Sequence, residues 1–170
     1  MISGKVLIVL GSDSDLETIA VTRETLNEFD IAHEVRIASA HRSPDHTAAL
    51  LRGAKQNGFA VVIAAAGLAA HLSGVCAAHT LLPVIAIPLD RSSLGGRDSL
   101  YASVMMPAGV PVAAVAIDKP GAKNAALLAV RILALSDQTL HAKLETYAAN
   151  MTAAVLEKDK KLVAKQNSQS

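Results

Sequence analysis

Two short polar segments of this chain contain side chains that could together hold a phosphate and move a proton. The first, Ser39-Ala40-His41-Arg42-Ser43-Pro44-Asp45, combines an imidazole, a guanidinium and two hydroxyls. Histidine exchanges a proton near neutral pH, and the planar fork of arginine matches the oxygens of a phosphate. Pro44 suits the first turn of a helix, which would fix the backbone behind these groups. The alternative is an ordinary loop in which Ser43 caps that helix.

The second segment, Gly11-Ser12-Asp13-Ser14-Asp15, follows an apolar run of strand length. A glycine turn that leads into a helix exposes backbone N–H groups and the positive end of the helix dipole, both of which favour an anion. Ser12 or Ser14 can add hydroxyl donors, and one of the aspartates can accept hydrogen bonds from sugar hydroxyls. Helix capping by the same residues is an equally good interpretation.

Two further segments have the composition of ligand-binding loops. In the stretch from Ala64 to Gly74 most residues are small, which allows the backbone to approach a flat ligand closely. His71 within it could orient that ligand or steady the loop. The polar stretch from Ser92 to Leu100 could cover a bound ligand or form an ordinary turn.

The elements that must position these segments alternate between buried strands and helices. This alternation predicts βαβ units and a parallel sheet, so we expect an open three-layer α/β/α sandwich. Ligands of such sheets bind at the carboxyl ends of the strands, where all four segments fall. The expected strands are 5–10, 33–38, 59–65, 83–87 and 112–117, and the expected helices are 16–29, 44–57, 72–81, 121–135 and 138–165.

The chain length of 170 residues fits one domain. We expect residues 1–165 to form a single catalytic domain and residues 166–170 to form a frayed tail. The long final helix follows a completed sheet and has little domain left to cover. It is therefore interpreted as an arm that packs on a neighbouring subunit.

Composition excludes several classes of function. The formal net charge is +1 and aromatic residues make up 2% of the chain, so a nucleic-acid partner is not expected. The histidines lack the spacing of zinc ligands, and no metal site is expected. Cys76, the single cysteine, is interpreted as a small buried hydrophobe in a reducing compartment. With no leader pattern and no membrane-length apolar run, we expect a cytoplasmic protein without membrane contact.

In this order, the segments resemble the family of N5-carboxyaminoimidazole ribonucleotide mutase, also called the catalytic subunit of phosphoribosylaminoimidazole carboxylase. The resemblance covers nearly the whole chain, apart from the C-terminal tail. It is carried by GSDSDL at Gly11, SAHRSPD at Ser39, AAHLSG at Ala69, LPVIAIP at Leu82 and DSLYASVMMPAGVPVAAVAI at Asp98.

The resemblance implies a flavodoxin-like subunit in a homo-octamer, with sites at subunit contacts and no metal or organic cofactor. The implied reaction of purine biosynthesis moves a carboxylate from the exocyclic nitrogen of an aminoimidazole ribonucleotide to ring carbon C4. His41 would be the proton shuttle. The implied substrate-binding residues are Ser12, Ser39 and Arg42 at the phosphate, Asp15 at the ribose, and Ala66, Gly67, Ala69, His71 and Leu72 around the imidazole and the migrating carboxylate.

The chain departs from the family pattern at two positions. Leu68 stands where a second glycine is common after Gly67, and Ser73 stands where proline is usual. Two other functions remain open. One is direct carboxylation of aminoimidazole ribonucleotide by CO2, although the animal-type enzyme lacks the AAHL signature. The other is a non-catalytic flavodoxin-like binding module, which the Ala64-Ala65-Ala66 run disfavours because receiver domains carry an aspartate there.

Overall fold

The computed structural model describes residues 4–167 of the chain. Its strands are β1 (Lys5–Leu10), β2 (His33–Ile37), β3 (Phe59–Gly67), β4 (Val84–Leu89) and β5 (Ala113–Ala114). Its helices are the short 3-10 turn η1 (Asp13–Asp15), α1 (Leu16–Glu28), α2 (Pro44–Gly53), α3 (Leu72–His79), α4 (Arg97–Val104), α5 (Asp118–Ala134) and α6 (Gln138–Asn167).

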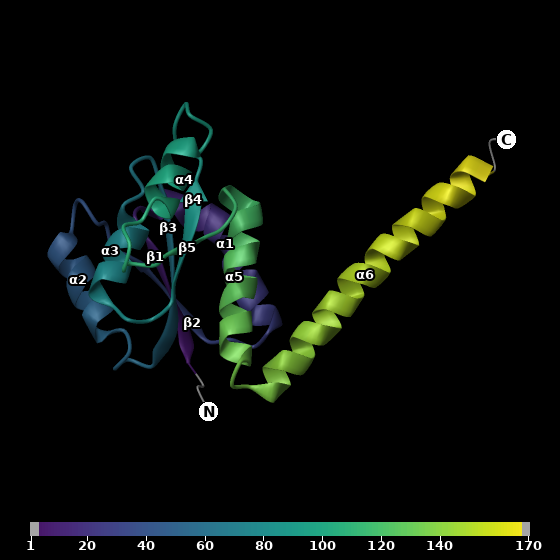
Figure 1. The fold of residues 1–170 in the computed structure, drawn as a ribbon, viewed down its shortest axis with the longest axis horizontal. Coiled ribbons are helices and arrows are strands. Elements are labelled where there is room, and N and C mark those ends of the chain that lie inside the picture. The colour runs from purple at the N-terminus through teal and green to yellow at the C-terminus, as the bar shows by residue number, and fades with distance from the viewer. Residues whose placement is uncertain (1–3, 168–170) are drawn as a thin grey trace.

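The five strands form one parallel sheet in the order β2-β1-β3-β4-β5. This is the strand order of flavodoxin-like folds, in which the order of strand addition reverses between β1 and β3 while all strands remain parallel. Helices cover both faces of the sheet (Figure 1). The predicted three-layer α/β/α sandwich is therefore confirmed.

The three central strands are apolar on both sides because both faces of the sheet are covered. Successive side chains of a strand point to opposite faces, so neighbours in sequence enter different layers. Ile8 and Ile63 belong to a core that includes α1 and α5, whereas Leu7 and Val62 belong to a core that includes α2 and α3. These two cores fix the sheet between its helices and hold the loops at its carboxyl edge.

Several predicted boundaries are wrong. The strand expected over 112–117 is reduced to Ala113–Ala114, which pairs only with β4 at the sheet edge and follows Pro111, a residue without an N–H donor. The helix expected to begin at Gly121 begins at Asp118 because Pro120 fits the first turn. The helix expected to reach Asn57 ends at Gly53.

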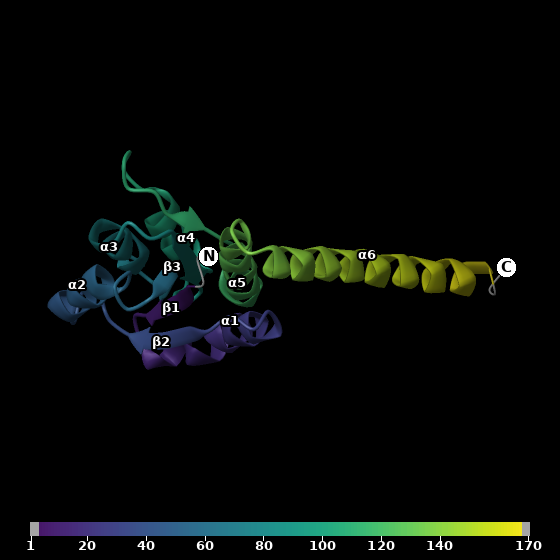
Figure 2. The ribbon, with the colours of Figure 1, turned by 90° about the horizontal axis from the view of Figure 1, so that it is seen from below.

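Helix α6 projects away from the layered body (Figures 1 and 2). Leu140, near its start, is the one residue of this helix that is buried within the described chain. The helix extends to Asn167, and residues 168–170 of the expected tail lie outside the described residues. No helix in residues 4–167 combines the length and hydrophobicity that a membrane crossing needs.

Candidate active site

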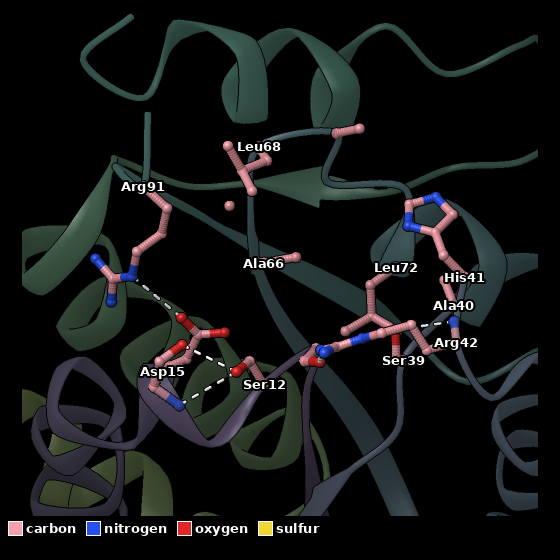
Figure 3. Close-up of a pocket in the computed structure, with 14 residues that line it drawn as sticks. Ser12, Asp15, Ser39, Ala40, His41, Arg42, Ala66, Leu68, Leu72 and Arg91 are labelled. Atoms are coloured by element: carbon pink, nitrogen blue, oxygen red, sulfur yellow. Dashed lines mark hydrogen bonds and ion pairs between the residues drawn. The ribbon is translucent and has the colours of Figure 1, made fainter. Parts of the chain in front are cut away.

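A pocket with a volume of about 480 Å³ lies where the loops after β1, β2, β3 and β4 meet at the carboxyl edge of the sheet (Figure 3). This is the position at which open parallel sheets bind ligands. The predicted residues that line it are Ser12, Asp15, Ser39, His41, Arg42, Ala66, Gly67, Ala69 and Leu72. Of the ten predicted site residues, only His71 is not part of this lining.

Arg42 is held by the loops after β1 and β2. Its Nη2 donates a hydrogen bond to the Gly11 carbonyl oxygen at 2.8 Å, and its Nε donates to Ser39 Oγ at 3.4 Å. The backbone N–H of Arg42 also donates to Ser39 Oγ at 3.2 Å. The guanidinium is therefore oriented at the pocket wall, where it can meet an anion without a large loss of side-chain entropy.

Ser43 occupies the N-cap position of α2, as the loop alternative assumed, but its side chain makes no capping hydrogen bond to the helix. Its hydroxyl accepts a hydrogen bond from the Ser39 N–H at 3.0 Å and donates to the Ser39 carbonyl oxygen at 3.2 Å. Thr47 also donates to the Ser39 carbonyl oxygen. These bonds tie the start of the loop to the first turn of α2 and thereby fix the backbone on both sides of His41.

The loop after β1 forms a capped helical turn and also contributes to the pocket. Ser12 caps η1, because its Oγ accepts a hydrogen bond from the Ser14 N–H at 3.3 Å, and it also lines the pocket. The Asp15 side chain is only 6% exposed, and Nε of Arg91 donates to its Oδ1 at 3.2 Å. Burial raises the pKa of the Asp15 carboxyl above its ordinary value, while the hydrogen bond and charge of Arg91 oppose that rise.

His41 and His71 form a hydrogen-bonded pair of imidazoles. Nε2 of His41 lies 2.9 Å from Nδ1 of His71, and the rings meet edge to face with centroids 5.0 Å apart. In such a pair one ring nitrogen donates and the other accepts, so each imidazole orients the other. His71 therefore contributes to the site through His41 although it does not line the pocket.

The small-residue loop contains one bulky residue in an unusual conformation. Leu68 has a φ of 55°, which lies in the left-handed region that favours glycine, and its side chain is exposed at the pocket. A few residues later, Ser73 is buried in the first turn of α3, and its hydroxyl has no hydrogen-bond partner among residues 4–167. Both departures from the family pattern thus have a local structural cost.

Arg91 is the functional residue that the sequence analysis missed. It is the second residue after β4 and lines the pocket, whereas the neighbouring stretch 92–100, interpreted as a possible ligand cover or an ordinary turn, contributes no residue to the lining. Its position after a strand was the signal that could have identified it, because ligands of parallel sheets bind at the carboxyl ends of strands and the other three loops of the pocket lie there.

The remaining histidines and the cysteine lie elsewhere. His46 and His141 are exposed, His33 is bonded to the Ile31 carbonyl oxygen, and His79 lines a different cavity. Cys76 is buried in the core, as predicted, and burial raises the pKa of its thiol to about 12. Among residues 4–167, no three His, Cys, Asp or Glu side chains are grouped closely enough to hold a metal ion.

The flavodoxin-like sheet and the pocket at its carboxyl edge define an α/β protein whose pocket contains a guanidinium and lies beside a pair of imidazoles. Residues 5–154 match the family model described as AIR carboxylase, so the chain belongs to the AIR carboxylase family.

Its relatives include two proteins named N5-carboxyaminoimidazole ribonucleotide mutase. The one from Brucella melitensis is 48% identical over 90% of this chain and 94% of its own length. The one from Escherichia coli K12 is 46% identical over 90% of each chain. The crystal structure of Treponema denticola PurE superimposes with a TM-score of 0.83 at 31% identity, covering 94% of this chain and 98% of that one.

Proposed function

We propose that this chain is a mutase that converts N5-carboxyaminoimidazole ribonucleotide to 4-carboxy-5-aminoimidazole ribonucleotide in purine biosynthesis. The observation that carries the proposal is the hydrogen-bonded pair His41 and His71 at the edge of a pocket that also contains Arg42. The pocket thus brings a group that can transfer a proton close to a group that can bind a phosphate. The names of the relatives, at up to 48% identity over about 90% of the chain, support the same reaction.

The first half of the reaction breaks the bond between nitrogen and the carboxylate carbon. A carbamate loses CO2 readily once its nitrogen is protonated, and His41 supplies that proton. The products of this step are the free amine of aminoimidazole ribonucleotide and one molecule of CO2. His71 accepts or returns a proton through its hydrogen bond to His41 and keeps the ring oriented.

The second half forms the carbon–carbon bond. The electron-rich C4 of the aminoimidazole attacks CO2, and C4 then carries both the new carboxylate and a hydrogen. His41, neutral after the first step, removes that proton and restores the aromatic ring. The proton balance is zero, so a single imidazole serves both steps and the enzyme returns to its starting state.

The small residues that line the pocket, Ala66, Gly67 and Ala69, let the loop lie close to the imidazole ring of the substrate. Leu72 adds an apolar side chain to the same wall. A narrow, apolar wall keeps CO2 near C4 and limits its loss to water, so confinement supplies much of the rate.

The remaining pocket residues bind the nucleotide. Ser12, Ser39 and Arg42 hold the phosphate, where Arg42 brings a charge already oriented by Gly11. Asp15 accepts hydrogen bonds from the ribose hydroxyls. All four residues line the same pocket, which supports their assignment to one nucleotide.

Direct carboxylation of aminoimidazole ribonucleotide is the competing function, because it gives the same product in the same fold. Product formation from the N5-carboxylated nucleotide should therefore be compared with that from the uncarboxylated nucleotide plus low bicarbonate. A mutase converts the first rapidly and the second hardly at all. The reverse preference would make the chain a direct carboxylase, and no product from either substrate would favour a binding module.

We also propose that α6 packs on neighbouring copies in a homo-octamer. Val155 and Leu162 are one heptad apart, as are Leu156 and Val163, and all four are exposed on this helix. A helix so isolated lacks the tertiary packing that stabilises most protein helices. The count of eight follows from the family resemblance, and sedimentation of the intact chain tests it.

The proposed setting is the cytoplasm, with the chain acting as one catalytic domain that includes α6. The buried thiol of Cys76 is compatible with a reducing compartment. Contacts between α5 and the start of α6 support inclusion of the arm in the domain, since Leu140 joins the core of α1 and α5.

A further inference from the structure

Arg91 has a hydrogen-bond or ion-pair partner for every nitrogen of its guanidinium. Its Nε donates to Asp15 Oδ1 at 3.2 Å, and its Nη2 donates to Thr18 Oγ1 at 2.9 Å. Its Nη1 donates to the Asp90 carbonyl oxygen at 3.0 Å and lies 3.6 Å from Asp118 Oδ1. Asp118 in turn accepts a hydrogen bond from the Asp90 N–H at 3.0 Å. The guanidinium is therefore fixed by groups from three separate segments.

The aliphatic stem of Arg91 is fixed as well. A Cβ on Gly67 would lie 2.6 Å from Arg91 Cβ and 2.5 Å from Arg91 Cγ, so the absence of a side chain at Gly67 lets the stem lie against β3. Only 31% of the Arg91 side chain is exposed. A residue held at both ends in this way forms part of the pocket wall rather than a mobile surface charge.

Arg91 also stands between two cavities. It lines the candidate active site and an adjoining cavity of about 450 Å³ whose lining includes Thr18, Asp118 and Lys119. The ion pair between Arg91 and Asp15 joins the loop after β4 to the loop after β1 across this boundary. The pair thus closes the pocket at the side opposite His41 and Arg42 (Figure 3).

We propose that Arg91 is a positioning residue for the nucleotide: it holds the Asp15 carboxylate in a single orientation as the acceptor for the ribose hydroxyls. This inference rests on the proposed function and assigns a role that the motif segments do not contain. Arg91 acts through Asp15 and not on the substrate itself, because each of its three guanidinium nitrogens already has a partner within the protein.

The electrostatics of Asp15 explain why the carboxylate needs this partner. Burial raises the pKa of Asp15, and the neighbouring Asp13 raises it further, whereas Arg91 and the Ser12 backbone lower it. Asp118 faces the same guanidinium and offsets part of its charge. Without Arg91, Asp15 takes up a proton at a higher pH and loses an acceptor for the sugar.

The experiment compares Arg91→Gln, Arg91→Lys, Asp15→Asn and the double variant Asp15→Asn/Arg91→Gln with the wild-type chain. Binding of the product 4-carboxy-5-aminoimidazole ribonucleotide is measured by calorimetry, and KM and kcat are measured with the N5-carboxylated substrate. Arg97→Gln is the matched control, because it removes the same charge at the start of α4, outside both cavities.

We expect Arg91→Gln to weaken binding and raise KM by about tenfold or more with a much smaller change in kcat. Arg91→Lys should recover part of the affinity, since it restores the charge but not the two-sided fork. The double variant should bind no more weakly than Asp15→Asn alone, because the two residues act as one unit. Arg97→Gln should match the wild type.

A pH series adds a readout that a purely structural role would not move. Nucleotide affinity falls as pH is lowered through the pKa of Asp15. In Arg91→Gln this fall should occur at a higher pH, because the charge that lowers that pKa is gone, and in Asp15→Asn it should disappear.

Unchanged affinity in Arg91→Gln, strictly additive losses in the double variant, or a loss confined to kcat would each overturn the proposal. If Arg91→Gln does not fold, Arg91→Lys decides the question: wild-type KM and an unshifted pH profile would count against positioning by the fork. A wild-type chain that fails to convert the N5-carboxylated nucleotide would instead overturn the proposed function, so the two failures are distinguishable.

Discussion

The two sides of the pocket are each built on a pair of side chains from distant segments, but the pairs differ in burial and in chemistry. On one side, which we call the imidazole side, His41 and His71 are 30 residues apart in sequence and both are exposed. On the other, the carboxylate side, Asp15 and Arg91 are 76 residues apart and the carboxylate is almost entirely buried.

The difference between these two sides explains how one pocket can combine proton transfer with substrate binding. Proton transfer needs a group that gains and loses a proton in each turnover, and exposed imidazoles can do so without a large desolvation cost. Recognition of neutral hydroxyls needs an acceptor that keeps its charge, and a buried carboxylate keeps it when a cation is fixed beside it. Changes on the two sides should therefore have separable effects on kcat and on affinity.

The largest effect is expected on the imidazole side. His41→Asn should lower turnover by about 10²–10⁴-fold, because it removes the group that gives and takes the proton, and should leave nucleotide affinity nearly unchanged. Stopped-flow or coupled assays give kcat, and calorimetry gives the affinity. His46→Asn is the control, since His46 is exposed in the first turn of α2 and lies outside the pocket. Substantial activity in His41→Asn would remove it from the shuttle role.

A smaller loss is expected at its partner. His71→Asn should lower kcat on the order of 10- to 100-fold, because the ring of His41 loses the contact that orients it. The double variant His41→Asn/His71→Asn should be no slower than His41→Asn alone. Additive losses in kcat would contradict the interpretation of the two imidazoles as one unit.

Arg42 tests whether the anchoring of the nucleotide is independent of the imidazole side. Arg42→Ala should weaken product binding by about 1.5–3 kcal/mol, the range for a hydrogen bond to a charged group, with a smaller change in kcat at saturation. Arg36→Ala, an exposed residue of β2 outside the pocket, serves as the matched control. Equal affinities of Arg42→Ala and the wild type would show that Arg42 does not hold the phosphate.

The smallest effect concerns the packing beneath the imidazole side. Ser73 is 2% exposed and its hydroxyl has no hydrogen-bond partner in the described part of the chain, so Ser73→Ala should raise the free energy of unfolding by about 1 kcal/mol. Ser99→Ala is the opposite control, because the buried Ser99 hydroxyl donates to the Leu89 carbonyl oxygen at 2.9 Å and its loss should destabilise the protein. Chemical denaturation measures both, and a destabilised Ser73→Ala would refute the account of this site.

Most of the fold was predictable because its signals are local. Continuous apolar runs identified the central strands, and Pro44 marked the beginning of α2. The two-residue β5 was not predictable in length, because an edge strand is set by pairing with β4 rather than by its own sequence. The start of α5 at Asp118 was missed for a similar reason: Asp118 has a φ of 56°, and its carboxylate is held by Asp90 and Arg91.

The candidate site shows the same division between local and distant signals. Ser39, His41 and Arg42 lie in one contiguous motif and could be selected together, and the structure places all three at the pocket. Arg91 belongs to no motif, and its role depends on a contact with Asp15 that forms only when the loops after β1 and β4 meet. Functional groups that are close along the chain can be identified from the sequence. Side chains that are far apart in sequence and meet only in the folded protein can be paired only once the fold is known.

The measurement that tests the central claim most directly follows the carboxyl carbon itself. N5-carboxyaminoimidazole ribonucleotide labelled with ¹³C in its carboxylate is converted in the presence of excess unlabelled bicarbonate. The ¹³C content of the carboxylate attached to C4 of the product is then measured by mass spectrometry. The account predicts that most of the label is retained, because CO2 stays confined in the pocket between the two steps. A product that carries unlabelled carboxylate would contradict it, since the carbon would then have come from solution.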